Sequence, residues 1–301
     1  MELRHLKYFA TLAEELNFNR AAARLHISQP PLTRQMQQLE AELGATLFVR
    51  HPRGVELTAA GLALLDDARR ILGMVNQAKD RAGKSGRGEI GRLDVGIYGS
   101  AILNHIPRLL LQFRSRYPDV QIGLHELTKV EQIQALREKR LTIGFNRHVS
   151  VEPDIMVETV YLEPLVVALP SAHPLAQHKK IRIKALMDEP LILYPNNTRP
   201  GFADHVMAVL RNEGIAPRVV QEVKDVVTAV ALVGSGFGLC VTPEAASSLR
   251  LPGVVYRPID ANPPPTIDLV CLYRRDDDAP ILAAFLDTVR KFRPQAPEGL
   301  V

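Results

Sequence analysis

Residues 28–38 carry polar side chains whose hydrogen-bonding groups match the exposed edges of base pairs. Gln37 can pair with adenine and Arg34 with guanine, whereas Thr33 can contact a base or the methyl group of thymine. The hydroxyl of Ser28, at the amino end of a predicted helix, suits a backbone phosphate. The alternative is an ordinary solvated helix face, but such a face would carry Lys and Glu, and this one has Gln and Arg without an acid. The candidate DNA-binding residues are Ser28, Gln29, Pro30, Pro31, Thr33, Arg34, Gln37, Arg50 and Arg53.

The charges of this region are segregated along the chain. Residues 1–58 contain 7 basic and 6 acidic side chains, so their sum is nearly neutral. Residues 16–39, however, contain Arg20, Arg24 and Arg34 and no acid, and the turn at 47–55 adds two more arginines, again without an acid. Clustering of bases, and not net charge, is the signature of phosphate binding.

A second group of candidate residues follows consecutive predicted strands in the later part of the chain. Ser100 and Thr128 each follow a strand and would cap the next helix, which places a hydroxyl beside unpaired backbone amides. Arg147 follows the third strand, so the three donors could converge on one anion where the strand ends meet. Ser and Thr caps are most often only caps, and that alternative stays open. Thr198 and Phe202 are the candidates from the facing side of the cleft.

Catalytic chemistry has little support in the sequence. None of the motifs HExxH, GxSxG, GxxxxGK[ST] or GxGxxG stands in the context that its chemistry needs. The two cysteines, Cys240 and Cys271, cannot build a disulfide scaffold or a Cys-rich zinc site. Both lie in apolar strand segments, where a thiol is usually inert, so redox sensing is disfavoured. The expectation is a protein that is not an enzyme and has no cofactor, metal or catalytic residue.

Composition places the chain among ordinary globular proteins. Its 301 residues are 46% apolar and 23% charged, which allows two or three domains with packed cores. The net charge of +4 is too small to identify a partner by itself. The start, MELRHLKYF, does not resemble a signal peptide, and no run of about 18 apolar residues predicts a membrane span. These features favour a cytoplasmic protein without a membrane partner.

The first ninety residues predict a winged helix-turn-helix followed by a long helix. Apolar periodicity predicts helices over 3–13, 20–25 and 28–43, a turn at 17–19, and a hairpin that turns at 51–54. A helix over 58–82 carries apolar residues at spacings of 4, 3, 4, 3 and 4, which is a heptad seam. The seam needs a partner helix, most simply from a second copy, although packing on its own domain is the alternative. Its residues are Leu64, Ala68, Ile71, Val75, Ala78 and Ala82.

The remainder of the chain alternates strands and helices. Four glycines between residues 83 and 91 predict a flexible hinge before it. The alternation predicts an α/β region with a mostly parallel sheet, and its length of about 210 residues favours two lobes. Strands are predicted over 92–99, 120–124, 141–145, 155–160, 165–169, 191–194, 219–223, 239–241 and 267–273, and helices over 101–116, 128–139, 202–212, 226–233 and 281–292.

The segments MELRHLKYF, NRAAARLHISQPPLTRQMQQLEAELGATLFVR and RGVELTAAG together resemble the amino-terminal signature of LysR-type transcriptional regulators. The resemblance implies a homotetramer built as a dimer of dimers, promoter DNA as partner, and a two-lobed effector domain like that of periplasmic binding proteins. It also implies the domain boundaries: 1–58 for the winged helix-turn-helix, 59–89 for the linker helix and hinge, 90–163 with 268–301 for one lobe, and 164–267 for the other.

Within that family the chain is most similar to regulators of catechol, chlorocatechol and benzoate catabolism. The matching stretches are LTKVEQIQAL, IGFNR, DEPLILYP and RPGFAD. The resemblance implies an activator of an aromatic-degradation operon that responds to cis,cis-muconate, a chloromuconate or a similar small anion, with RNA polymerase as a further candidate partner. The alternative is a solute-binding protein or a small-molecule enzyme with an accessory nucleic-acid module.

Overall fold

The computed structural model describes residues 1–51, 54–147, 152–195 and 200–292. The chain forms two compact units, Met1–Lys84 and Ser85–Val301. No helix in the described residues is long and apolar enough to cross a membrane.

The first unit packs three helices and a two-stranded wing around one apolar core. Leu32, Met36 and Leu39 are buried on one side of α3, as their spacing predicted, and Gly44 ends that helix with a positive φ of 64°. The turn expected at 17–19 is shorter, because Asn17 caps a helix that already starts at Phe18. The elements are α1 Leu3–Glu15, α2 Phe18–Arg24, α3 Gln29–Leu43, β1 Phe48–His51 and β2 Gly54–Leu57, with the two strands antiparallel.

The long helix α4 spans Ala59–Gly86 and is longer than predicted. Of its seam, Ala68 is buried in the core of the first unit and Leu64 and Ile71 are partly buried against it, whereas Val75 is 38% exposed and Ala78 is also exposed. The seam therefore loses its cover beyond Ile71, which lies in the fourth turn of the helix. The hinge prediction at 83–91 was wrong for its first residues, because glycine within a helix costs only about 1 kcal/mol relative to alanine and does not break it.

The second unit is built on a mixed sheet in the order β4-β3-β5-β12-β6-β11-β7, with β10 also paired to β6. The prediction of a mostly parallel sheet was wrong at its centre, where β12 is antiparallel to both β5 and β6. A parallel pair, β8-β9, lies apart from this path. The strands are β3 Gly91–Ile97, β4 Val120–Glu126, β5 Ile143–Asn146, β6 Ile155–Pro170, β7 Ile181–Arg182, β8 Pro190–Leu193, β9 Arg218–Glu222, β10 Cys240–Pro243, β11 Val254–Asp260 and β12 Thr266–Arg274.

Helices cover the sheet on both faces. The α-helices are α5 His105–Arg116, α6 Lys129–Arg137, α7 Phe202–Asn212, α8 Val226–Gly234 and α9 Pro280–Lys291, and the short 3₁₀ helices are η1 Gly99–Leu103, η2 Pro174–Gln177, η3 Ile183–Leu186 and η4 Glu244–Ser248. Side chains of α5 and α9 pack with β3 and β5 in one apolar cluster, the β3–β5 core. A second cluster, the β8–β10 core, joins α7 and α8 to β8, β10 and part of β6.

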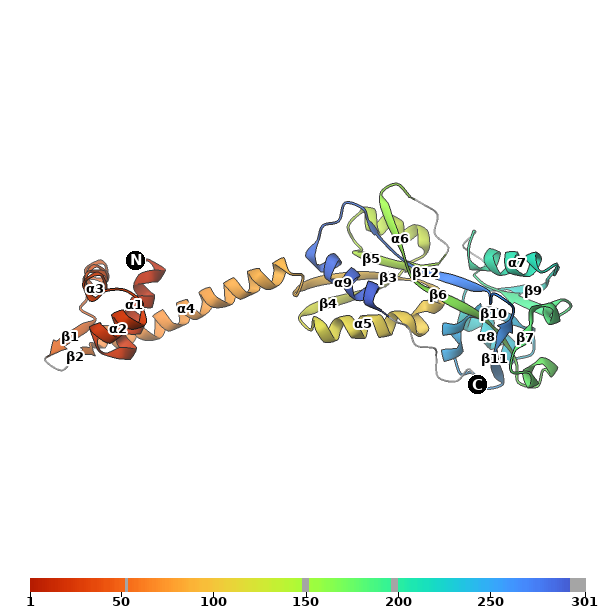
Figure 1. Ribbon diagram of the computed structural model, residues 1–301, viewed down its shortest axis with the longest axis horizontal. Coiled ribbons are helices and arrows are strands. Elements are labelled where there is room, and N and C mark those ends of the chain that lie inside the picture. Colours follow the sequence, from red (N-terminus) through yellow and green to blue (C-terminus); the bar gives the residue numbers. More distant parts are fainter. Residues whose placement is uncertain (52–53, 148–151, 196–199, 293–301) are drawn as a thin grey trace. The chain divides into compact units, whose positions relative to one another are not determined.

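The central strands β6 and β12 each contribute to both cores. Two strands were predicted over 155–160 and 165–169, but β6 runs unbroken and pairs with β12 along most of its length (Figure 1). Its first half packs near the β3–β5 core through Val160 and Tyr161, and its second half places Leu165 and Val167 in the β8–β10 core. The chain thus crosses between the two cores within one strand.

Candidate functional site

The outer face of α3 presents the predicted base-contacting residues to solvent. Ser28, Arg34 and Gln37 are exposed, and Thr33 and Pro31 are partly exposed. Among described residues, neither the Ser28 hydroxyl nor the Arg34 guanidinium has a hydrogen-bond or ion-pair partner. Gln29 and Thr33 bond each other within the helix, the Gln29 amide donating to the Thr33 hydroxyl at 3.0 Å. The predicted residues that lie on this face or directly before it are Ser28, Gln29, Pro30, Pro31, Thr33, Arg34 and Gln37, and all of them are at least partly exposed.

Two other arginines of the helix pair are less free than their sequence neighbourhood suggested. Arg24 lies 2.8 Å from a carboxylate oxygen of Glu14 and 3.1 Å from one of Glu15. Arg20 donates to the backbone oxygen of Glu15 at 2.5 Å. The acids of α1 thus balance the bases of α2 in space, which corrects the expectation of an acid-free basic surface. Arg34, in contrast, has no acidic partner among the described residues.

The wing is fastened to the turn between α1 and α2. The amide of Val55 donates to the carbonyl of Leu16 at 3.1 Å, and the guanidinium of Arg50 lies 4.9 Å from the centre of the Phe18 ring. This cation–π contact orients Arg50 on an exposed strand. The other wing candidate, Arg53, lies outside the described residues.

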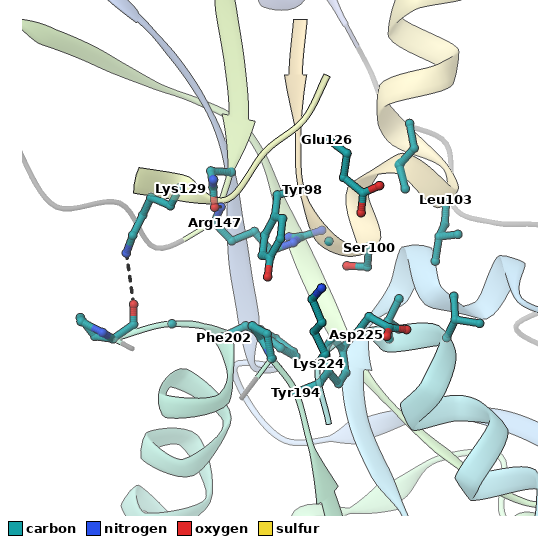
Figure 2. A pocket seen from close by; sticks show the side chains of 18 residues that line it. Tyr98, Ser100, Leu103, Glu126, Lys129, Arg147, Tyr194, Phe202, Lys224 and Asp225 are labelled. Carbon is teal, nitrogen blue, oxygen red and sulfur yellow. Dashed lines mark hydrogen bonds between the residues drawn. The ribbon is translucent and has the colours of Figure 1, made fainter. Parts of the chain in front are cut away.

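A cavity of about 310 Å³ lies where the carboxyl ends of β3, β4 and β5 face the first turns of α7 and α8. From the strand side it is lined by Tyr98, Ser100, Glu126 and Arg147, and from the other side by Tyr194, Phe202 and Lys224 among others (Figure 2). The ends of neighbouring parallel strands are the usual ligand site of α/β proteins, and here they form a pocket large enough for a small organic acid.

Several hydrogen-bond donors at the strand side of this pocket have no protein partner. The Nε and Nη1 atoms of Arg147 and the Nδ2 atom of Asn146 are buried and make no hydrogen bond among the described residues. The Ser100 side chain is likewise buried, and no described residue bonds its hydroxyl. A buried donor without an acceptor costs about 1–3 kcal/mol, so a ligand that supplies acceptor oxygens here regains that energy.

Arg147 is held in place by a buried acid. It donates through Nη2 to Glu163, whose side chain is fully buried and also accepts the amide of Ala245 at 2.5 Å. His105, itself buried, lies 3.5 Å from Glu163. Burial alone would raise the pKa of Glu163, but the charge of Arg147, the nearby imidazole of His105 and the hydrogen bond from Ala245 outweigh it and lower that pKa to about 2. The acid is thus ionised, and it fixes the guanidinium at the pocket wall.

The structure places the predicted pocket residues unequally. Ser100, Arg147 and Phe202 line the cavity. The prediction that Ser100 caps the next helix was wrong. Ser100 lies inside the 3₁₀ helix η1, and Asn104 occupies the cap position of α5. Thr128 does cap α6 and does not line the cavity.

Thr128 is occupied by its helix. Its hydroxyl donates to Glu131 at 2.8 Å, and the backbone amide of Thr128 donates to the same carboxylate at 2.8 Å. This reciprocal arrangement is a capping box, and the hydrogen bonds from Thr128 lower the pKa of Glu131. The remaining candidate, Thr198, lies outside the described residues.

Sequence inspection missed the acid and the histidine behind Arg147. His105 is 58 residues from Glu163 in the sequence, yet the fold brings the two side chains together. The signal for Glu163 was its place in the stretch YLEPLVVAL, where a single acid stands in an apolar strand. A buried acid needs a cation, and Arg147 was the nearest candidate at a strand end. Asn146 and Lys224, which line the same cavity, gave no comparable signal.

The cysteines are buried and unpaired. Cys240 and Cys271 are both free thiols without exposed surface. Burial raises the pKa of each to about 12, so neither is a thiolate near neutral pH. Among the described residues, no group of three or more His, Cys, Asp or Glu side chains is placed to hold a metal ion.

A winged helix-turn-helix joined to an α/β unit with a small-molecule pocket defines a DNA-binding regulator that has a ligand-binding domain. The chain matches the model of the bacterial regulatory helix-turn-helix proteins of the lysR family over residues 3–62 and that of the LysR substrate binding domain over residues 86–293. It belongs to the LysR family of transcriptional regulators. This decides between the two functional hypotheses in favour of the regulator.

Three known proteins illustrate the relationship. The transcriptional regulator TfdS of Cupriavidus pinatubonensis is 42% identical over 98% of this chain and 100% of its own. The crystal structure of CbnR, a LysR family regulator, matches with a TM-score of 0.91 and 38% identity over 96% of this chain and 100% of that one. The structure of CbnR bound to its target DNA matches with a TM-score of 0.83 and 37% identity over 97% of this chain and 99% of that one. The effector domain of BenM with its effector benzoate matches with a TM-score of 0.62 and 29% identity over 66% of this chain and 90% of that one.

Proposed function

We propose that this protein activates an aromatic-degradation operon when a small organic anion, such as cis,cis-muconate or a chloromuconate, enters the pocket beside Arg147. The single observation that carries the proposal is the pair of residues with buried donors that lack acceptors, Asn146 and Arg147, beside the unbonded hydroxyl of Ser100. A carboxylate has two oxygens that accept several hydrogen bonds, and charge-assisted bonds to a guanidinium are the strongest of these. Phe202 adds an apolar wall for a carbon chain.

The stretches LTKVEQIQAL, IGFNR, DEPLILYP and RPGFAD support an aromatic-catabolism context. The effector named for BenM is benzoate, an aromatic carboxylate, which fits the same donor chemistry. We do not assign Thr128 as a direct ligand, because its hydroxyl is bonded to Glu131. The pocket is a binding site and not a catalytic centre, without cofactor or metal.

Base contacts come from α3, and backbone contacts from its amino end and the wing. Arg34 and Gln37 contact bases, whereas Ser28 and Arg50 contact phosphates. The same set includes Gln29, Pro30, Pro31 and Thr33 on α3, and Arg53 at the wing. The structure of CbnR with its target DNA supports this role for the homologous domain. RNA polymerase is a further partner of the bound regulator, and the site of action is the cytoplasm.

The exposed part of the α4 seam supports assembly through paired linker helices. Val75, Ala78 and Ala82 are exposed in the single chain, and pairing with the same helix of a second copy would cover them. The assembly is a homotetramer made of two such dimers.

The domain division that fits this assembly has four parts. They are residues 1–58, the linker 59–89, a first lobe of 90–163 with 268–301, and a second lobe of 164–267. The two apolar clusters on either side of the middle of β6 support the division into lobes.

The test is calorimetric titration of cis,cis-muconate into the full-length protein, paired with gel shifts on DNA from upstream of its operon. Ser100→Ala is expected to weaken muconate binding about tenfold, because one hydrogen bond to a charged group is lost, and to leave DNA binding without effector unchanged. Ser115→Ala is the matched control, since that exposed hydroxyl bonds within α5. Equal affinity in the parent and Ser100→Ala would refute the site. Absence of binding by muconate, chloromuconates and benzoate would refute an anionic effector.

A further inference from the structure

Lys224 stands out among the charged residues of the pocket. It lies between β9 and α8, on the side of the cavity that faces Arg147, and its side chain points into the cavity (Figure 2). It makes no hydrogen bond or ion pair with any described residue. An ammonium group kept at a ligand cavity without a partner is free to bind an anion.

Two of the neighbouring charged residues, Asp225 and Lys129, are already engaged. Asp225 caps α8 by accepting the amide of Thr228 at 2.9 Å. Lys129, from the opposite side, donates to the carbonyl of Pro200 at 3.2 Å. Each of these groups has a structural task, and Lys224 has none within the described part of the chain.

We propose that Lys224 determines the preference of the pocket for dianionic over monoanionic effectors, by binding the second carboxylate. This inference rests on the proposed function, which places the first carboxylate at Ser100, Asn146 and Arg147. Those three residues belong to the first lobe, and Lys224 belongs to the second. A dicarboxylate that spans the cavity therefore contacts both lobes, whereas a monocarboxylate leaves Lys224 without a ligand.

Glu126 sharpens the discrimination. It lines the same cavity at the end of β4, points inward, and has no partner among the described side chains (Figure 2). Because Glu126 stands on the strand side with Ser100 and Arg147, its negative charge opposes every carboxylate in the cavity, and Lys224 offsets part of this repulsion from the facing side. Removal of Lys224 therefore weakens the binding of a dianion, which spans the cavity, more than that of a monoanion held at Ser100, Asn146 and Arg147.

The experiment compares two ligands that differ by one carboxylate. cis,cis-Muconate and the (2Z,4Z) isomer of hexa-2,4-dienoate share the diene, but the second has a methyl group in place of one carboxylate. Both are titrated calorimetrically into full-length parent, Lys224→Met and Lys224→Arg. Lys184→Met, which removes the same charge from an exposed position outside the cavity, is the control. Thermal unfolding of each variant verifies that it is folded.

The parent is expected to bind muconate at least about tenfold more tightly than hexadienoate, as a charge-assisted hydrogen bond implies. Lys224→Met should remove this preference by weakening muconate binding alone, and Lys224→Arg and Lys184→Met should retain it. The inference is overturned if Lys224→Met weakens both ligands equally or neither, or if the parent binds both equally well. In that last case the proposed anionic effector site still stands. If the parent binds neither ligand nor any other organic anion, the proposed function itself fails.

Discussion

Replacement of Arg147 by methionine is expected to destabilise the second unit by about 3–5 kcal/mol at neutral pH. Methionine has a similar length and no charge, so Glu163 would lose the cation that compensates its burial. Loss of one partner of a buried pair costs about this much, because the remaining charge is left in a poorly solvating interior. His105 and the amide of Ala245 remain but do not replace the positive charge of the guanidinium.

The magnitude follows from the ionisation of Glu163. Burial opposes its charge, but Arg147, His105 and Ala245 together hold its pKa at about 2, against an ordinary value of 4.5. At 1.36 kcal/mol per pKa unit, the ionised network contributes about 3 kcal/mol. Because the folded-state pKa is the lower one, this stabilisation is present above about pH 4.5 and is lost as the pH falls toward 2. In Arg147→Met burial dominates, the pKa of Glu163 rises above its unfolded value, and the variant becomes less stable as the pH rises.

Urea unfolding of the full-length protein, followed by far-ultraviolet circular dichroism between pH 4.5 and 7.5, measures both effects. Hydrogen exchange read by mass spectrometry assigns the transition to residues 85–301. The double variant Arg147→Met/Glu163→Gln should recover much of the loss, because the uncompensated charge is gone. A cost below about 1 kcal/mol for Arg147→Met, or a double variant as unstable as the single one, would refute the reasoning.

On the DNA-binding unit, Arg34→Ala is expected to cost about 1–3 kcal/mol of specific affinity in gel shifts. If the Arg34→Ala variant binds the operator as tightly as the parent, Arg34 does not contact a base. Ile71→Asp combined with Val75→Asp should dissociate the dimer, since unpaired charges are strongly disfavoured in an apolar seam. If this variant sediments as the same oligomer as the parent, the seam packs against its own domain instead. Cys240 and Cys271, whose pKa values burial raises to about 12, should not react with Ellman's reagent in the folded protein. Rapid labelling, or DNA binding that changes with peroxide, would contradict this.

Local signals in the sequence predicted the elements that are fixed by local chemistry. The helix over 202–212 was predicted with its observed bounds, and α3 begins after Ser28 and ends at Gly44 as its cap residues indicated. The strand β11 was missed, because Val254–Asp260 contains a proline and lacks clear alternation. The break expected near Pro164 does not occur either. Pairing with β12 extends up to Pro164, and pairing with β10 and β11 begins directly after it, so tertiary contacts without a local signature keep the strand continuous.

The part of the candidate site that could be predicted consists of residues that directly follow neighbouring parallel strands. Ser100 and Arg147 follow neighbouring strands, and parallel pairing of β3 with β4 and β5 brings both to one cavity. The role of Glu163 depends on the sheet order, in which β12, distant in sequence, lies between β5 and β6, so the contact of Glu163 with Arg147 could not be derived from spacing. The same holds for Arg24, whose partners on α1 lie beside it only after folding.

The late position of β12 and α9 in the chain bears on how the protein folds during synthesis on the ribosome. The β3–β5 core needs β12 and α9, with Phe285 and Val289 among its buried members, so it cannot close until nearly the last described residue has emerged. At about 5–20 residues per second, the roughly 200 residues from β3 to the end of α9 take about 10–40 s to synthesise. During that interval the apolar side of α5, including Phe113, lacks its final cover, while the β8–β10 core can already assemble from the segment in between. The exposed apolar surface of this nascent core is therefore a site where chaperones are expected to bind. A frameshift in α9 would harm that core first, although its first strands are encoded near the start of the α/β unit.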